Sequence, residues 1–228
     1  MTIVTVAKTD REMTHLRHLA LRMGGLAEEI LNKSLLALWN SDRKLAEEVV
    51  QDDLAIDRID VEIDAAVLSL LALRAPVASD LRHTLAVKTI ATDLERIGDL
   101  ARNIANSVQR LAQAPPMPTP ALLRDLAAES RRALNRAMQS FADLDVDLAR
   151  SVLEEDDAID EAEDRVIRES ISRLHLDPTY AHQEVDVIFI AQNLERVADH
   201  ATNIAEEVIL ATESINLKHA EKLSLSGE

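Results

Sequence analysis

Apolar residues recur at steps of three and four along most of the chain, which is the spacing of one buried face of an α-helix. The clearest run lies near the start and comprises Leu16, Leu19, Met23, Leu26, Ile30 and Leu31. Residues that stop helices are sparse, so each periodic stretch is long. The pattern predicts six long helices, at roughly residues 9–39, 42–73, 79–112, 121–142, 146–174 and 181–216.

Prolines divide the chain into two halves. Four of them lie within six positions of AQAPPMPTPA, residues 112–121. Proline lacks a backbone N–H and clashes with the preceding turn, so no helix continues through this segment. Three predicted helices precede it and three follow it. We therefore expect an all-α fold with a three-helix half at 1–112, a proline-rich linker at 113–120, a second three-helix half at 121–216 and a frayed tail at 217–228.

The composition agrees with helices and restricts the partners. Hydrophobic residues make up 47% of the chain but aromatic residues only 2%, so the core is built from Leu, Ile, Val and Ala. The net charge of −16 repels nucleic acids and anionic lipids, so neither is an expected partner. There is no cysteine, no apolar run of 18 residues, and no secretory signal in MTIVTVAKTDREMTHL. These features predict a cytoplasmic protein without membrane insertion.

The two halves share a sequence repeat. A shift of 100 residues places DLERIGDLARNIAN, which begins at Asp93, over NLERVADHATNIAE, residues 193–206, with eight of fourteen positions identical. A shift of 103 residues places DDLAID, residues 52–57, over EDDAID, residues 155–160. The matched segments fall on the second and third predicted helices of each half, so the chain is an internal duplication.

Acidic side chains four residues apart form a stripe in each half. Such neighbours repel by a few tenths of a kcal/mol, and most pairs of this kind are simply solvated. Their recurrence in both halves favours a function, because four carboxylates from two helices form a hard, oxygen-rich site that suits Mg, Mn or Fe. The repeated acids are Glu95, Asp99, Asp53 and Asp57 in the first half and Glu195, Asp199, Asp156 and Asp160 in the second. Possible additional ligands are Asn103, Asn203, Asp60, Glu163 and His200.

Taken together, these motifs resemble the PhoU family, the accessory and regulatory proteins of phosphate-specific transport systems. The resemblance covers nearly the whole chain. It rests on LRMGGLAEEIL, DDLAID, RAPVASDLR, KTIATDLERIGDLARNIA and NLERVADHATNIAE. It implies two three-helix bundles side by side, each with an acidic patch that binds metal at the eight repeated acids. Family members bind multinuclear iron clusters, or manganese, magnesium or zinc.

The same resemblance implies a cytoplasmic regulator that is not an enzyme. Its expected partners are the ATPase subunit of a phosphate transporter and a sensor histidine kinase, and its expected effect is to hold phosphate-starvation signalling off. A homodimer is possible. Asn193 stands opposite Asp93, and His200 stands opposite Leu100, so the two halves need not hold the same metal.

Two other functions remain open from the sequence. In one, the acidic stripes bind a basic partner surface directly and the protein is a metal-free adaptor. In the other, the carboxylates hold a catalytic metal, for example for hydrolysis of a phosphate ester. The enzyme is the weaker alternative, because the motif helices contain no Glu-x-x-His pair and no evident acid or base beyond the ligands.

Overall fold

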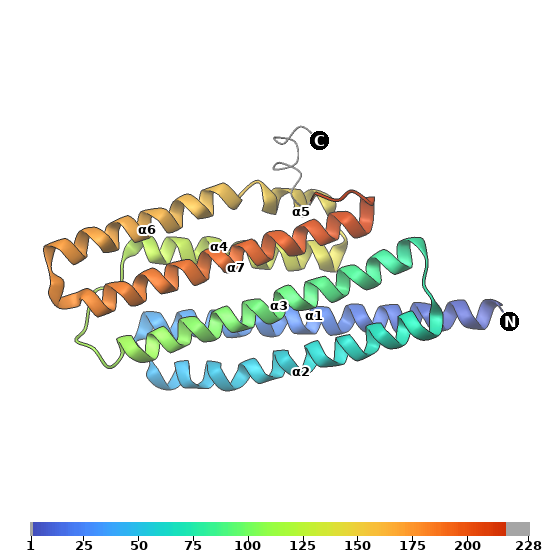
Figure 1. Ribbon diagram of the computed structural model, residues 1–228, viewed down its shortest axis with the longest axis horizontal. Coiled ribbons are helices and arrows are strands. Elements are labelled where there is room, and N and C mark those ends of the chain that lie inside the picture. Colours follow the sequence, from blue (N-terminus) through green and yellow to red (C-terminus); the bar gives the residue numbers. More distant parts are fainter. Residues whose placement is uncertain (1, 218–228) are drawn as a thin grey trace.

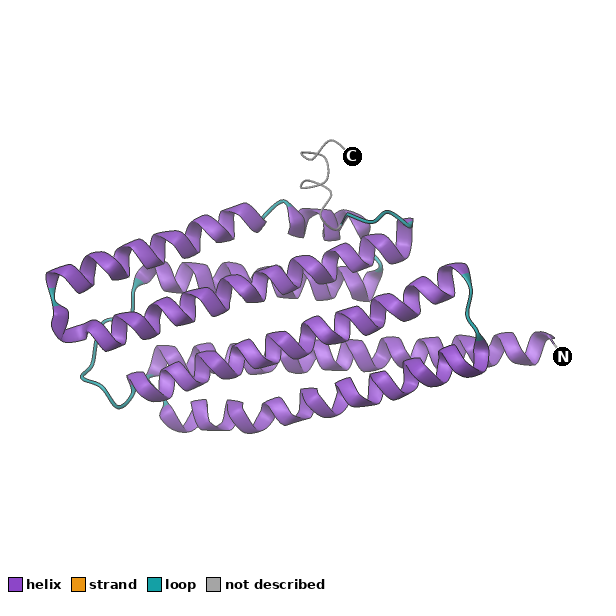
Figure 2. Ribbon diagram, in the orientation of Figure 1, coloured by secondary structure: helices purple, strands orange, loops and turns teal. Residues whose placement is uncertain are grey.

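The computed structural model describes residues 2–217, with side chains from residue 9 onward. Within this range the chain consists of helices joined by loops and has no strand (Figure 2). None of its helices is both long and apolar enough to cross a membrane. The elements in chain order are α1 (Thr2–Asn40), α2 (Arg43–Arg74), α3 (Ala78–Leu111), α4 (Ala121–Asp143), α5 (Val146–Leu153), α6 (Asp156–Leu176), the short 3₁₀ helix η1 (Pro178–Tyr180) and α7 (Ala181–Glu213).

The helices form two bundles that lie side by side (Figure 1). The first bundle contains α1, α2 and α3. The second contains α4, α7 and the pair α5–α6. Helix α3 runs along α7, and α1 contacts α4, so the two bundles share one continuous core of Leu, Ile, Val and Ala. The prediction of an all-α fold with two duplicated three-helix bundles is confirmed.

The turn that precedes the second helix of each bundle is duplicated in detail. Ser41 and Leu144 both have a positive φ, at 52° and 54°. The next residue caps the helix in both cases: Asp42 accepts a hydrogen bond from the backbone N–H of Leu45 at 3.0 Å, and Asp145 accepts the equivalent bond at 3.0 Å. The sequence repeat is therefore a repeat of local structure as well.

The helix predicted at 146–174 is not continuous: it breaks between α5 and α6 at Glu154 and Glu155. Four acidic residues follow one another here, from Glu154 to Asp157. Negative charge is unfavourable at the end of a helix and favourable in the first turn of the next one, so the run favours a new start. Arg136 of α4 holds the break, because it donates hydrogen bonds to the Glu155 carboxylate and, at 2.6 Å, to the Ser151 hydroxyl.

The ends of the chain also differ from the prediction. Helix α1 begins at Thr2, ahead of the predicted start at residue 9. Helix α7 ends at Glu213, and Leu217 then packs, partly buried, against the core. The rest of the predicted frayed tail, 218–228, lies outside the described residues.

Two adjacent glycines in the middle of α1 have different roles. A Cβ atom at Gly24 would lie 2.2 Å from Cε of Met138, so Gly24 lets α1 approach α4 closely. A Cβ atom at Gly25 would meet nothing within 4 Å. The small residues of the Met23–Gly24–Gly25 segment thus serve a close helix contact at one position only.

We expect Gly25→Ala to raise the free energy of unfolding by roughly 0.5–1 kcal/mol, because alanine has less backbone entropy to lose in a helix and has open space here. Urea denaturation measures this change. Gly24→Ala is the matched control and should be less stable than Gly25→Ala, because its new methyl group displaces Met138. A Gly25→Ala protein no more stable than the parent would contradict the prediction.

Candidate metal sites

Three carboxylates of the second bundle converge on one point of its surface. Glu195 and Asp199 lie one turn apart on α7, and Asp160 lies on α6. One oxygen from each carboxylate lies within 4.8 Å of the corresponding oxygens of the other two. Glu195 is partly buried, whereas Asp160 and Asp199 are exposed. The cluster is therefore held in place by the helices and remains open to a cation from solvent.

These carboxylates are incompletely neutralised. Burial, and then the negative charges of Asp199 and Asp160, raise the pKa of Glu195 to about 7. Burial, and then the charge of Asp156, raise the pKa values of Asp160 and Asp199, although His200 partly offsets the effect at Asp199. A bound cation would relieve this repulsion.

The chemistry of the cluster in the second bundle, formed by Asp160, Glu195 and Asp199, fits a hard metal ion. Its donors are carboxylate oxygens, which suit Mg, Mn or Fe better than metals that prefer thiolates. Asp156 lies next to the three converging acids, and its carboxylate accepts a hydrogen bond from the Thr202 hydroxyl at 3.1 Å. Burial, followed by the charges of Asp164 and Asp160, raises the pKa of Glu163, so that side chain extends the negative region along α6.

In the first bundle, an arginine lies inside the acidic cluster. Arg102 of α3 donates a hydrogen bond to Asp99 at 2.5 Å and another to Asp53 of α2. Asp53 is only 2% exposed, and burial raises its pKa even though Arg102 opposes that effect. Asp57 lies near enough for its charge to raise the pKa values of Asp53 and Glu95. Asp53 and Asp99 therefore come together here around a guanidinium group, with the charge of Asp57 nearby, whereas Glu95 lies beside Arg96.

A second cation, the partly buried Lys88, neutralises the neighbouring part of the first bundle. Nζ of Lys88 lies 3.3 Å from a carboxylate oxygen of Asp60 and 2.5 Å from one of Asp64. Arg96 is more exposed and lies 3.4 Å from Asp99. Asp60, a possible ligand on sequence grounds, is therefore part of an ion pair with lysine.

The first cluster is also more tightly enclosed. A Cβ atom at Gly98 would lie 2.7 Å from an oxygen of Asp53 and 3.1 Å from Cδ1 of Ile56, so the missing side chain lets α3 come close to α2. The second bundle has Ala198 at this position, and its Asp156 is only partly buried. The glycine thus helps to bury Asp53 together with its arginine partner.

Two further candidates from the sequence contact the opposite bundle. Nδ1 of His200 lies 2.9 Å from an oxygen of Asp93, and Asn203 donates to the same oxygen at 3.4 Å. Asp93 belongs to α3, so these side chains link α7 to the first bundle. Asn103, the counterpart of Asn203, is exposed.

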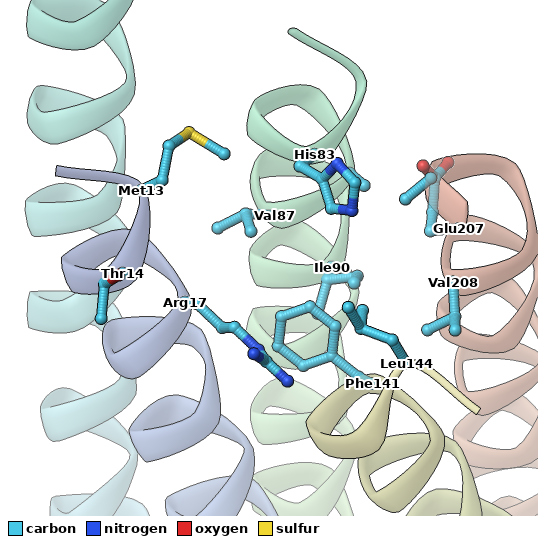
Figure 3. Close-up of a pocket in the computed structure, with 12 residues that line it drawn as sticks. Met13, Thr14, Arg17, His83, Val87, Ile90, Phe141, Leu144, Glu207 and Val208 are labelled. Atoms are coloured by element: carbon cyan, nitrogen blue, oxygen red, sulfur yellow. The ribbon is translucent and has the colours of Figure 1, made fainter. Parts of the chain in front are cut away.

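A cavity of about 210 Å³ lies between the bundles where α1, α3, α4 and α7 meet (Figure 3). Its wall is largely apolar and includes Val87, Ile90 and Phe141. Arg17 of α1 extends toward Phe141 and donates a hydrogen bond to the carbonyl oxygen of Ala142. The described lining includes none of the candidate metal ligands, so the cavity is separate from both acidic clusters.

Fold and clusters together define a class of protein: duplicated three-helix bundles that carry paired acidic stripes on their second and third helices. The PhoU domain matches the chain twice, at residues 20–108 and 123–208, once on each bundle. The chain therefore belongs to the PhoU family.

Relatives match over most of their length. The phosphate-specific transport system accessory protein PhoU homolog of Caulobacter vibrioides is 36% identical over 209 residues, with 90% of each chain covered. The homolog of Xylella fastidiosa is 37% identical over 204 residues, covering 90% of this chain and 85% of the relative.

Two solved structures share the fold. The crystal structure of PhoU from Pseudomonas aeruginosa has a TM-score of 0.88 at 33% identity, and 90% of this chain and 99% of that chain are covered. The phosphate transport system regulatory protein PhoU from Streptococcus pneumoniae has a TM-score of 0.85 at 29% identity, with coverage of 92% and 99%.

Proposed function

We propose that the protein is the accessory and regulatory component of a phosphate-specific transport system. The observation that carries this proposal is full-length similarity: both bundles match the PhoU domain, and the relatives that are named as accessory proteins of that system align over 90% of this chain. The similarity includes the fold, since the P. aeruginosa and S. pneumoniae PhoU structures superpose on both bundles.

The mechanism we propose is protein–protein contact in the cytoplasm. The protein docks on the ATPase subunit of the transporter and on a sensor histidine kinase, and it restrains phosphate uptake and starvation signalling while phosphate is plentiful. The acidic clusters support a docking role, because they form negative surfaces that a basic partner surface complements. No catalytic step is assigned to the carboxylates.

We further propose that Asp160, Glu195 and Asp199 hold a metal ion, with Asp156 beside them. Iron, manganese, magnesium or zinc would supply positive charge at this point and fix the position of the two helices. The metal thereby sets the shape and charge of the face that a partner recognises.

Binding to the two partners tests this function. We expect the purified chain to bind the purified transporter ATPase subunit and the cytoplasmic part of the sensor kinase in calorimetric titrations. Glu195→Gln/Asp199→Asn should weaken binding of the partner that docks on the second bundle by at least tenfold. Asp164→Asn is the matched control, because Asp164 belongs to an exposed ion pair outside the cluster of Asp160, Glu195 and Asp199, and it should leave binding unchanged.

The alternatives give different results. A metal-free adaptor would bind its partners equally well after metal removal. A carboxylate metalloenzyme would turn over a phosphate ester when loaded with metal. Failure to bind either partner under any metal condition would contradict the proposed function.

A further inference from the structure

The two bundles neutralise their acidic clusters differently at one pair of equivalent positions. Arg102 and Thr202 occupy the same place in the repeat, three residues after Asp99 and Asp199. Each contacts the equivalent acid of the neighbouring helix in its own bundle: Arg102 donates to Asp53, and Thr202 donates to Asp156 at 3.1 Å. The position thus has the same structural role in both bundles but carries a full positive charge in the first bundle only.

A second difference between the bundles is the loss of an ion pair. Lys88, which lies within 3.3 Å of Asp60 and 2.5 Å of Asp64, has Ile188 as its counterpart at the 100-residue shift. Asp64 has Ile167 as its counterpart at the 103-residue shift. The second bundle therefore has no cation at the position of Arg102. It also lacks both members of the Lys88–Asp64 ion pair, so Glu163, the counterpart of Asp60, has no lysine at the equivalent position.

We propose that Arg102 takes the place of a metal ion in the first bundle, so that this chain holds metal in its second bundle only. The inference rests on the proposed function in one respect, the metal site at Asp160, Glu195 and Asp199. It departs from the expectation that all eight repeated acids are ligands.

The chemistry of the guanidinium group supports this assignment. Arginine stays protonated at any pH at which the protein is folded, and its planar fork donates to two carboxylates at once. A metal ion at Asp53 and Asp99 would have to break both hydrogen bonds and would lie beside the displaced positive charge of Arg102. Thr202 presents no such obstacle, because a neutral hydroxyl donates one hydrogen bond and leaves the remaining carboxylate oxygens free.

The two bundles therefore respond differently to the supply of metal. The acidic face of the first bundle keeps the same charge whatever the supply of metal. The face of the second bundle changes its charge when a cation binds. A partner that docks on the second bundle therefore responds to metal, and a partner that docks on the first does not.

Exchange of the two residues tests the inference by metal content. The chains are incubated with Mn²⁺, freed of excess ion and analysed for manganese per chain. We expect Arg102→Thr to raise the content about twofold and Thr202→Arg to reduce it to background. Arg102→Lys, which keeps the charge, should leave it unchanged. Circular dichroism confirms that each variant is folded.

A neutralised pair in each bundle locates the ions. Glu195→Gln/Asp199→Asn should remove the manganese of the parent chain, and Glu95→Gln/Asp99→Asn should not. Added to Arg102→Thr, however, Glu95→Gln/Asp99→Asn should remove the manganese that the arginine substitution introduced. Loss of manganese from the parent chain on Glu95→Gln/Asp99→Asn would show that the first bundle already holds metal, and the inference would be wrong.

The remaining outcomes separate the inference from the proposed function. A parent chain without manganese, together with an Arg102→Thr chain that binds it, supports the role of Arg102 and refutes the second-bundle site. If neither the parent chain nor the Arg102→Thr chain binds manganese, the role of Arg102 and the second-bundle site are both refuted. If Arg102→Thr does not fold, Thr202→Arg decides: full retention of manganese by that variant overturns the inference.

Discussion

Replacing Arg102 by methionine lowers the free energy of unfolding of the metal-free protein by roughly 2–3 kcal/mol at neutral pH. The reason is the burial of Asp53, which is 2% exposed and depends on Arg102 for its charge compensation. Removal of one partner of a buried ion pair leaves an uncompensated charge, which typically costs about 3–5 kcal/mol. The side chain of Arg102 is 35% exposed, so water reaches part of the pair and the expected cost lies at or below the lower end of that range. Urea denaturation in the presence of a chelator measures the loss.

Arg96→Met is the matched control on the same helix. Arg96 is 56% exposed and its nearest carboxylate oxygens, on Glu95 and Asp99, lie at 3.4 Å. An exposed pair of this kind contributes less than about 1 kcal/mol. Equal effects of the two substitutions would mean that Asp53 does not depend on Arg102. Excess Mn²⁺ should raise the stability of Arg102→Met more than that of the parent or of Arg96→Met, because only Arg102→Met gains a second carboxylate cluster that is free to bind the ion.

Much of this fold follows from the sequence because helix periodicity and duplication are both local signals. The apolar spacing of α1 and the proline run after α3 are visible without any knowledge of contacts. The break between α5 and α6 is harder to predict, since the apolar pattern continues across it. The acidic run at Glu154 to Asp157 indicates it only when charge is weighed along with hydrophobicity.

The acidic clusters illustrate a different limit. Repetition of the acids identifies the positions that come together, and the structure gathers Asp160, Glu195 and Asp199 as a set. Alignment of the acidic residues alone does not show that the positively charged Arg102 lies among those of the first bundle. The signal was present in the repeat, because Arg102 stands opposite Thr202, but its meaning depends on which side of α3 faces Asp53. The direction of His200 toward Asp93 likewise depends on how the two bundles pack together.

Removal of metal lowers the melting temperature of the parent chain by roughly 5–10 °C. A ligand present at one hundred times its Kd stabilises a folded protein by about 2.7 kcal/mol. For a chain of this size, each kcal/mol shifts Tm by about 2–4 °C. Differential scanning calorimetry with Mn²⁺ and with excess chelator measures the change, and elemental analysis verifies that the metal has been removed.

Variants of the two bundles assign that shift to a site. Glu195→Gln/Asp199→Asn should abolish the response to chelator and should melt no lower than the chelated parent, because neutral side chains avoid both the burial of charge and the repulsion that raise the pKa of Glu195 to about 7. Glu95→Gln/Asp99→Asn should retain the full response. An unchanged Tm after verified metal loss would mean that water and neighbouring cations already stabilise the second cluster. The acidic faces would then act as docking surfaces without metal, and the regulatory role would rest on their charge alone.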